Sequence, residues 1–594
     1  MKVAEVVAHT LARAGVRQVF GLIGSGNFHV TNALVAAGAR FVPAVHESGA
    51  ATMADAYARV SGRLGVLSVH QGPGVTNALT GITEAAKSRT PLLVLAPEAT
   101  APRSNFFIDL PAAAAALGAR YHRVRAESAA SDTWEAVRVA QSGHTVVLGL
   151  PLDVQGQDAA PGPQADDAAD PRAVGADELP VGSAGPAGSL AAGTAASADP
   201  PAGGVAGSAG PGPGSGRGGP EPGAPDEADV AWLAGVLRTA GRPVFIAGRG
   251  ATRQPARARE ALTRLADRCG ALLAVSAAAK GLFAGDPWYL DVSGGFATPL
   301  AAELIGGADL VVAWGSTLNM WTMRHGRLIP AGATVAQVDL DGDAIGVNRV
   351  VDGGIVGDVA LVADAVLSML DGWSAPGWRT DALHGRIAAE GRWRDVPFVD
   401  DAPAGTVDPR TLSIALDDAL PADRTVVVDS GNFMGYPAMF LSVPDSAGFC
   451  FTQAFQSVGL GLASALGAAV ARPDRLTVAA LGDGGFLMSA AELATAVRLG
   501  LPLVIVVYDD AAYGAEVHHF GPDGHPLDLV RLPDRDLAEI ARGYGCEAIT
   551  VRSPADLAPL RDWLAGPRGR PFVVDAKVSA VRGSWWLEEA FRGH

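Results

Sequence analysis

The chain has 594 residues, 48% of them hydrophobic, and a formal net charge of -16, so its length exceeds what one core usually supports and several domains are expected. The acidic balance argues against a nucleic-acid partner, because phosphate backbones bind basic surfaces. No apolar run is long enough to span a membrane and the N-terminus lacks the layout of a secretion signal, so we expect a cytoplasmic protein without a membrane partner.

The first block, residues 1–157, alternates short apolar strands with helices. The pattern predicts helices over residues 3–14, 49–60 and 76–88 and strands over residues 18–22, 41–45, 66–69 and 92–96. This alternation is typical of a parallel sheet wrapped by helices. Loops at residues 24–26 and 72–74 follow predicted strands, where such sheets bind ligands.

Glu47 follows the strand predicted over residues 41–45 and precedes a run of small residues. Burial among small apolar residues would raise the pKa of this carboxyl group, which suits a proton-transferring acid. The alternative is that Glu47 caps the start of the following helix.

Residues 158–228 are rich in Ala, Gly, Pro, Ser and Asp and predict a disordered linker. A central α/β domain is predicted over residues 229–372, with strands at 243–247, 310–314 and 334–340. After a connector at 373–404, a third block over 405–594 has a strand at 425–428, a helix at 459–471 and a strand at 477–481. The predicted fold class is α/β, with three doubly wound parallel-sheet domains and one disordered insert.

The most informative segment lies in the third block, between residues 482 and 510. Asp483 stands between glycines after an apolar strand, where backbone N–H groups approach a phosphate closely. A helix predicted over residues 489–498 would point its N-terminus at that anion. A buried strand over residues 501–507 then leads to Asp509 and Asp510. Mg²⁺ takes one or two carboxylates together with phosphate oxygens and water, so the segment predicts a metal-bound phosphate. The alternative is an ordinary turn with two solvated acids.

Together these motifs resemble the thiamine diphosphate-dependent enzymes, and more narrowly the acetolactate synthase and 2-oxo acid decarboxylase superfamily, which includes benzoylformate decarboxylase. The resemblance covers all three blocks and leaves out only the linker. It implies the domain order pyrimidine-binding, central and diphosphate-binding. Motifs that match the pyrimidine-binding domain are residues 19–21, Glu47 with 54–59, 72–77 and 90–92.

The resemblance also implies roles for individual residues. Glu47 would act on the aminopyrimidine ring of the cofactor. Mg²⁺ would be held by the side chains of Asp483 and Asp510 and the carbonyl of Ala512. Further cofactor contacts are implied for Pro73, Asn77, Gly431, Asn432, Phe433, Val458, Gly482, Gly484 and Gly485.

Two positions depart from the family pattern. Relatives usually end the metal strand with two asparagines, whereas this chain has Asp509 and Asp510. The extra charge beside a diphosphate should weaken cofactor binding unless a cation offsets it. Residues 430–433 replace a Gly-Gln-His turn, which removes one side-chain donor and leaves Gly431.

The resemblance implies a carboligase of the acetolactate synthase type, which decarboxylates a 2-oxo acid and adds the enamine to a second carbonyl. A non-oxidative decarboxylase of the benzoylformate decarboxylase type is the alternative, with Ser25 and His70 as catalytic residues. A non-catalytic cofactor-binding paralogue is the third option. Residues 248–250 and 339–341 would fit FAD in the central domain, but such short motifs do not favour it. The family also implies a homodimer or homotetramer with active sites between chains.

Overall fold

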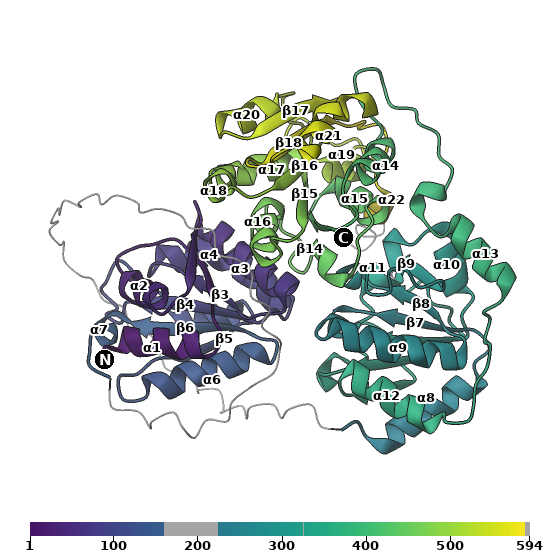
Figure 1. Cartoon of the computed structure of the whole chain (residues 1–594), viewed down its shortest axis with the longest axis horizontal. Helices are drawn as coiled ribbons and strands as arrows, with labels where there is room; N and C mark the ends of the chain where they lie inside the picture. Colours follow the sequence, from purple (N-terminus) through teal and green to yellow (C-terminus); the bar gives the residue numbers. More distant parts are fainter. Residues whose placement is uncertain (160–223, 325, 589–594) are drawn as a thin grey trace. The chain divides into compact units, whose positions relative to one another are not determined.

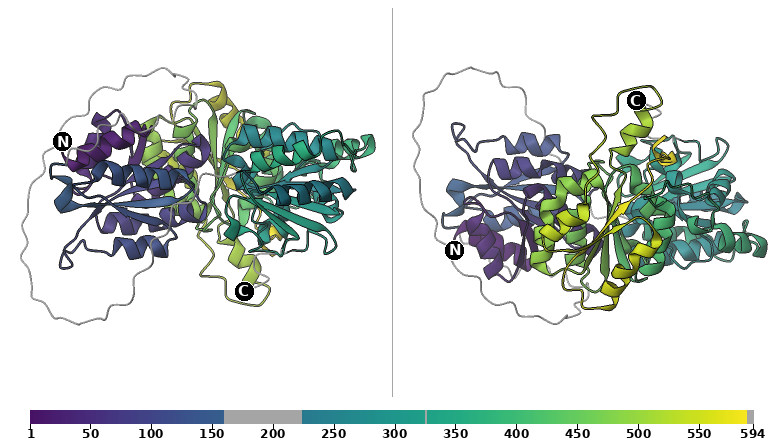
Figure 2. Two further views of the ribbon diagram at one scale, coloured as in Figure 1. Left: turned by 90° about the horizontal axis from the view of Figure 1, so that it is seen from below. Right: turned by 90° about the horizontal axis from the view of Figure 1, so that it is seen from above.

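The computed structural model describes residues 1–159, 224–324 and 326–588. Most of the linker predicted over residues 158–228 therefore lies outside the described residues. The described residues form three six-stranded sheets in which all strand pairs are parallel. Helices cover the faces of the sheets (Figures 1 and 2). The predicted α/β fold class with three doubly wound sheets is confirmed.

The first sheet has the strand order β2-β1-β3-β4-β6-β5. Its strands are β1 (Gln18–Gly21), β2 (Arg40–Pro43), β3 (Gly65–Ser68), β4 (Leu92–Glu98), β5 (Arg120–Arg123) and β6 (Thr145–Pro151). Its helices are α1 (Val3–Arg13), α2 (Phe28–Ala36), α3 (Glu47–Ser61), α4 (Pro73–Lys87), α5 (Leu110–Ala116), α6 (Ala129–Gln141) and α7 (Leu152–Gln155). The chain turns in opposite directions from β1 to β2 and from β1 to β3, so ligands are expected at the carboxyl ends of β1 and β3.

The second sheet has the order β12-β11-β10-β7-β8-β9. Its strands are β7 (Pro243–Ala247), β8 (Leu272–Val275), β9 (Tyr289–Val292), β10 (Leu310–Trp314), β11 (Thr334–Asp339) and β12 (Gly353–Val356). Helices α8 (Glu227–Thr239), α9 (Pro255–Cys269), α10 (Pro299–Gly306), α11 (Met320–Met323) and α12 (Val359–Met369) accompany it, and α13 (Asp381–Glu390) follows. Strands β7, β8 and β10 are buried along their whole length, as expected of a sheet covered on both faces.

The third sheet repeats the strand arrangement of the first, in the order β14-β13-β15-β16-β18-β17. Its strands are β13 (Arg424–Val428), β14 (Phe449–Phe451), β15 (Leu476–Gly482), β16 (Leu503–Asp509), β17 (Glu547–Val551) and β18 (Phe572–Lys577). Its helices are α14 (Pro409–Ala419), α15 (Gly435–Phe440), α16 (Gly461–Ala471), α17 (Asp483–Ser489), α18 (Leu493–Leu499), α19 (Gly514–Phe520), α20 (Leu537–Gly543), α21 (Ala558–Ala565) and α22 (Trp585–Glu588). Its switch point lies between β13 and β15.

Helix α3 of the first domain packs closely against helix α16 of the third. Both helices are rich in small residues, and a Cβ atom added at Gly467 would lie 2.1 Å from the carbonyl oxygen of Met53. The two domains therefore share one hydrophobic core, because backbones that approach this closely leave no room for water.

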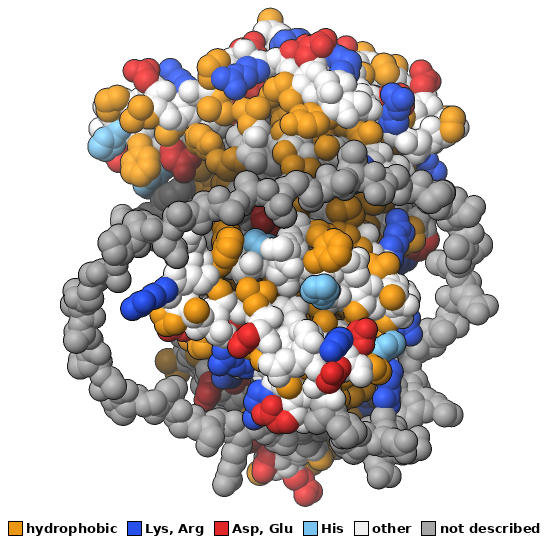
Figure 3. Space-filling model, turned by 90° about the vertical axis from the view of Figure 1, so that its left-hand side faces the viewer, with side chains coloured by type: hydrophobic (Ala, Val, Ile, Leu, Met, Phe, Trp, Pro, Cys, Tyr) orange, Lys and Arg blue, Asp and Glu red, His pale blue; other side chains and the backbone are white. Residues whose placement is uncertain are grey.

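Charged side chains of both signs are interspersed on the described part of the face shown in Figure 3. This mixture gives that face no continuous basic surface of the kind that nucleic acids bind. Among the described residues, no helix is long and apolar enough to cross a membrane.

Candidate active site

A cavity of about 350 Å³ opens at the switch point of the third sheet. Its walls come from the segments that follow β13, β15 and β16, together with Met320 and Trp321 from the second domain. Because the sheet is parallel, the carboxyl ends of these neighbouring strands meet at one edge. Ten residues that the sequence predicts as cofactor or metal contacts line this cavity: Gly431, Asn432, Phe433, Val458, Gly482, Asp483, Gly484, Gly485, Asp510 and Ala512.

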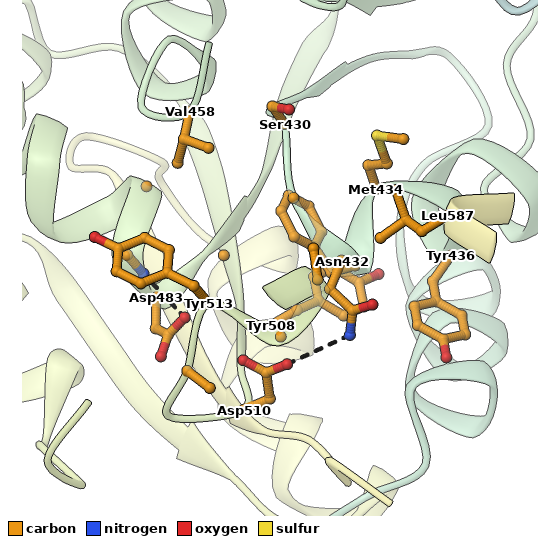
Figure 4. A pocket seen from close by; sticks show the side chains of 18 of the residues that line it. Ser430, Asn432, Met434, Tyr436, Val458, Asp483, Tyr508, Asp510, Tyr513 and Leu587 are labelled. Atoms are coloured by element: carbon orange, nitrogen blue, oxygen red, sulfur yellow. Dashed lines mark hydrogen bonds between the residues drawn. The ribbon is translucent and has the colours of Figure 1, made fainter. Parts of the chain in front are cut away.

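Asp483 and Asp510 face the cavity from adjacent strands, and Val458 lies across from them (Figure 4). Asp483 is 4% exposed, so it is not a solvated turn residue. Burial, and then the nearby carboxylates of Asp510 and Asp509, raise the pKa of Asp483. Burial likewise raises the pKa of Asp510 to about 7. Carboxyl groups held together in this way favour a divalent cation between them.

Glycines leave room for a ligand beside these carboxylates. A Cβ atom at Gly514 would lie 2.3 Å from Oδ2 of Asp510, and one at Gly484 would lie 2.7 Å from the Tyr513 ring. Gly431 has a φ of 142°, which side chains other than glycine rarely adopt. The backbone therefore approaches the cavity at positions where any side chain would fill it, which suits a bound diphosphate.

Asn432 supplies a side-chain donor in this turn. Its Nδ2 lies 3.5 Å from Oδ2 of Asp510 (Figure 4). The hydroxyl of Ser584 donates to Asn432, 2.7 Å from Oδ1 and 2.6 Å from the carbonyl oxygen. Because Oδ1 is occupied by Ser584, the amide nitrogen is directed toward Asp510.

Asp429 directly follows β13 and contacts the turn that carries Val458. It is fully buried and accepts hydrogen bonds from the backbone N–H groups of Ser430, Gly459 and Leu460, at 2.8, 2.9 and 3.1 Å. Burial raises the pKa of Asp429 to about 7, although these hydrogen bonds lower it. Asp429 therefore joins two walls of the cavity, the end of β13 and the turn before α16.

Asp509 carries the extra charge noted in the sequence and is not among the described residues that line the cavity. Its Oδ2 lies 2.5 Å from Nζ of Lys577, at the end of the neighbouring strand β18. Both side chains are buried. A cation therefore stands beside the extra carboxylate.

Glu47 is the first residue of α3 and is 7% exposed. Its Oε2 accepts a hydrogen bond from Nδ2 of Asn77, at 3.1 Å. The alternative that Glu47 caps the helix is wrong: the cap is His46, whose side chain accepts from the N–H of Ser48. The carboxylate is therefore free for another role.

His70 lies in the same region as Glu47, and the N–H of Gly26 approaches its Nδ1 at 3.3 Å. Its pKa is lowered by burial and raised by the charge of Glu47, with burial the larger effect. Ser25 is exposed on the loop beside it, and Pro73 begins α4. The structure thus brings the predicted residues of the first domain together, but Glu47 is not among the described residues that line the cavity with Asp483.

The helix predicted over residues 489–498 is wrong in its start and its continuity. Helix α17 begins at Asp483, and a 3-10 turn at Ala490–Glu492 separates it from α18. Gly484 and Gly485 are helical, and a Cβ atom at these positions would lie 2.7 Å from the Tyr513 ring and 2.5 Å from Oδ2 of Asp429. Asp483 is therefore the first residue of a helix, not part of a loop.

Five residues of this region were not predicted from the sequence: Asp429, Glu492, Glu516, Lys577 and Ser584. Glu492 accepts from the backbone N–H groups of Val45 and His46 at 3.1 and 3.0 Å, so it positions the start of α3. Of these five, Lys577 has a sequence signal, because a charged residue directly after the largely apolar run at 572–576 is unusual.

No group of three or more His, Cys, Asp or Glu side chains in the described ranges is placed to hold a metal by itself. The predicted set has two carboxylates and one carbonyl, so a cation here needs further oxygens. Diphosphate and water would supply them, which is how Mg²⁺ is usually bound. The donors and the glycine-walled cavity fit a magnesium diphosphate.

Three family models match the chain in the order of its three sheets. The N-terminal binding domain of thiamine pyrophosphate enzymes matches residues 1–115, the central domain matches 230–366 and the C-terminal binding domain matches 429–576. Together these matches cover most of the chain outside the linker.

Curated relatives match over nearly the full length. The chain is 27% identical to a sulfoacetaldehyde acetyltransferase of Alcaligenes xylosoxydans, over 94% of this chain and 89% of the relative. It is 29% identical to a probable 2-ketoarginine decarboxylase of Pseudomonas aeruginosa, over 95% and 91%. It is 26% identical to the acetolactate synthase isozyme 2 large subunit of Escherichia coli, over 99% and 97%. The chain belongs to the thiamine pyrophosphate-dependent enzymes of the acetolactate synthase-like superfamily.

Proposed function

We propose that the protein is a thiamine diphosphate- and Mg²⁺-dependent carboligase that decarboxylates a 2-oxo acid and adds the product to a second carbonyl compound. The observation that carries the proposal is the cavity in which Asp483 and Asp510 face a glycine-lined wall. Relatives named as an acetyltransferase and an acetolactate synthase favour transfer to an acceptor over simple release.

Asp483, Asp510 and the carbonyl of Ala512 would hold Mg²⁺, and the backbone around Gly484 would contact the diphosphate. Asn432 would donate a hydrogen bond from its amide nitrogen, which Ser584 orients. The bound cofactor supplies a carbon centre that accepts the electrons left when carbon dioxide departs. These residues bind and orient it, and they carry no proton in the reaction.

Glu47 would hold and move the proton on the pyrimidine ring of the cofactor. Its oxygen Oε2 is engaged by Asn77, which fixes the direction of the carboxylate. Because Glu47 does not line the cavity of its own chain, we propose a homodimer or homotetramer in which Glu47 of a second copy completes each site.

Met320, Trp321, Met434 and Leu587 give the cavity apolar lining. Figure 4 shows Met434 beside Leu587. Such a lining excludes water near the reacting carbon. Exclusion of water favours addition to a second carbonyl, since it limits premature protonation of the reacting carbon.

A non-oxidative decarboxylase is the second candidate, and one residue favours it. Glu516 is a half-buried carboxyl in the cavity wall that is not one of the predicted metal ligands. A carboxylic acid there would be a proton donor for aldehyde release. In a Glu516→Gln variant, a decarboxylase would lose aldehyde formation by about 100-fold. A carboligase would keep its acyloin product.

The proposal is tested by carbon dioxide release from pyruvate and a panel of larger 2-oxo acids, with products identified by mass spectrometry. We expect release that needs both thiamine diphosphate and Mg²⁺, with an acyloin or acyl-transfer product. Aldehyde as the sole product would favour the decarboxylase. Tight cofactor binding without carbon dioxide release from any substrate would support the non-catalytic paralogue.

A further inference from the structure

A buried ion pair joins the ends of two neighbouring strands behind the proposed metal site. Asp509 ends β16 and Lys577 ends β18, and the two residues are partners in the strand register. Nζ of Lys577 lies 2.5 Å from Oδ2 of Asp509. The two residues are 6% and 7% exposed, so neither charge is screened by water.

The ammonium group has three further partners besides Asp509. It donates to the carbonyl oxygen of Arg535 at 2.5 Å and pairs with Asp575 and Asp534, each at 3.2 Å. Neither Asp509 nor Lys577 is among the described residues that line the cavity. Any effect of Lys577 on a ligand in the cavity would therefore be indirect, through Asp509.

Asp509 in turn supports the turn that carries two predicted metal ligands. Its Oδ1 accepts a hydrogen bond from the N–H of Ala511 at 3.0 Å. Ala511 has a φ of 53°, a left-handed conformation that is strained for an alanine. This strained residue lies between Asp510 and Ala512. The carboxylate of Asp509 thus stabilises the turn at residues 510–512, which we call the metal turn.

The carboxylate of Asp509 also places a negative charge near the proposed diphosphate site. Asp509 directly precedes Asp510, one of the two carboxylates that face the cavity. A buried negative charge so close to a diphosphate site would oppose the anion by direct repulsion.

We propose that Lys577 is a positioning residue that neutralises Asp509, so that the carboxylate can hold the metal turn without repelling the diphosphate. The inference rests on the proposed cofactor site. Mg²⁺ would then be left to offset Asp483 and Asp510, the two carboxylates that face the cavity.

The test is calorimetric titration of thiamine diphosphate at saturating Mg²⁺, with the full chain. We expect Lys577→Met to raise the Kd by roughly tenfold or more, because Asp509 is left unpaired. The double variant Asp509→Asn with Lys577→Met removes the charge of Asp509 together with its partner. Asp575 also loses Lys577 but does not line the cavity, so the Kd should return to within about threefold of the wild-type value.

The matched control is Lys280→Met, which removes another buried lysine. Lys280 pairs with Asp291 at 2.8 Å in the second domain and does not line the cavity. It should lower the melting temperature of the cofactor-free protein while leaving the Kd unchanged. A general loss of stability is thereby separated from an effect on the cofactor.

A wild-type Kd in the Lys577→Met variant would overturn the inference, and so would a double variant as weak as the single one. If Lys577→Met does not fold, the double variant alone tests the inference. A tenfold rise in its Kd for thiamine diphosphate would overturn the inference, because Lys577 would then act by a route other than Asp509. Absence of binding by the wild-type protein would instead contradict the proposed function.

Discussion

The side-chain amide of Asn77 donates to Glu47, with 3.1 Å between Nδ2 and Oε2. Glu47 is the first residue of α3 and Asn77 is the fifth residue of α4, and both helices follow strands of the first sheet. The hydrogen bond fixes the carboxylate of Glu47 without neutralising it. We therefore expect Glu47 to act in proton transfer and not in holding the fold together.

Glu47→Gln keeps the size and the hydrogen-bonding capacity of the side chain but removes its basicity. Carbon dioxide release should fall by about 100-fold or more, while the Kd of thiamine diphosphate changes by less than about threefold. Steady-state kinetics and calorimetry measure the two effects. Glu135→Gln is the control, because Glu135 pairs with Arg138 on an exposed helix face. Wild-type turnover in Glu47→Gln would contradict a role of Glu47 in proton transfer.

A site shared between two copies predicts that two inactive variants complement each other. Glu47→Gln lacks the pyrimidine-side carboxylate, and Asp483→Ala lacks a metal ligand. After random exchange of subunits, half of the dimers are mixed and each of these has one intact site. Activity should therefore recover to roughly a quarter of the wild-type value. Mixtures that stay inactive, with exchange verified by mass spectrometry, would place both residues in one chain's site.

The orientation of Asn432 predicts graded losses of cofactor affinity. Asn432→Ala removes the donor near Asp510 and should raise the Kd of thiamine diphosphate by about tenfold. Ser584→Ala leaves the amide in place but frees it to turn, so a smaller rise of about threefold is expected. Fluorescence titration at saturating Mg²⁺ measures both. Equal losses in the two variants would show that Ser584 does more than orient the amide.

Asp429 predicts a pH-dependent difference between the wild-type protein and Asp429→Asn. The pKa in the fold, about 7, lies above the ordinary carboxyl value. The protonated carboxyl of Asp429 therefore stabilises the fold fully below about pH 4, and this contribution to the free energy of unfolding is lost as the pH rises through 7. The asparagine does not titrate. The variant should be less stable by about 1 to 2 kcal/mol at pH 5, and this gap should narrow by about 1 kcal/mol or more at pH 8.

Urea unfolding of the cofactor-free proteins at the two pH values measures that gap. The comparison cancels the titration of Asp510, which both proteins retain. A gap that widens toward pH 8 would show that the buried carboxylate of Asp429 is stabilising in its charged form.

Much of the cavity was predictable because parallel sheets bring strand ends together. The apolar runs before Asp483 and before Asp509 are long and continuous, so both buried strands were identified with small errors in their ends. Once the strands are adjacent, Asp483 and Asp510 must lie near each other. Residues in the turns that follow each strand were therefore found from the sequence.

Partners supplied by distant segments were not predictable in the same way. Lys577 lies 68 residues after Asp509, and their contact depends on the pairing of β16 with β18. Ser584 reaches Asn432 across 152 residues. The start of α17 was missed for another reason. Glycine has a low helix propensity, so the sequence did not predict a helix at Gly484, whereas the close approach of Tyr513 leaves room only for glycine at that position.

The central claim is that the cavity between Asp483 and Asp510 binds thiamine diphosphate through a divalent cation. Isothermal titration of thiamine diphosphate into the protein, with Mg²⁺ or with EDTA, tests it most directly. The account predicts saturable binding of one cofactor per chain with Mg²⁺, loss of that binding in EDTA, and loss of it in Asp483→Ala. Binding that persists in EDTA, or that Asp483→Ala leaves unchanged, would contradict it.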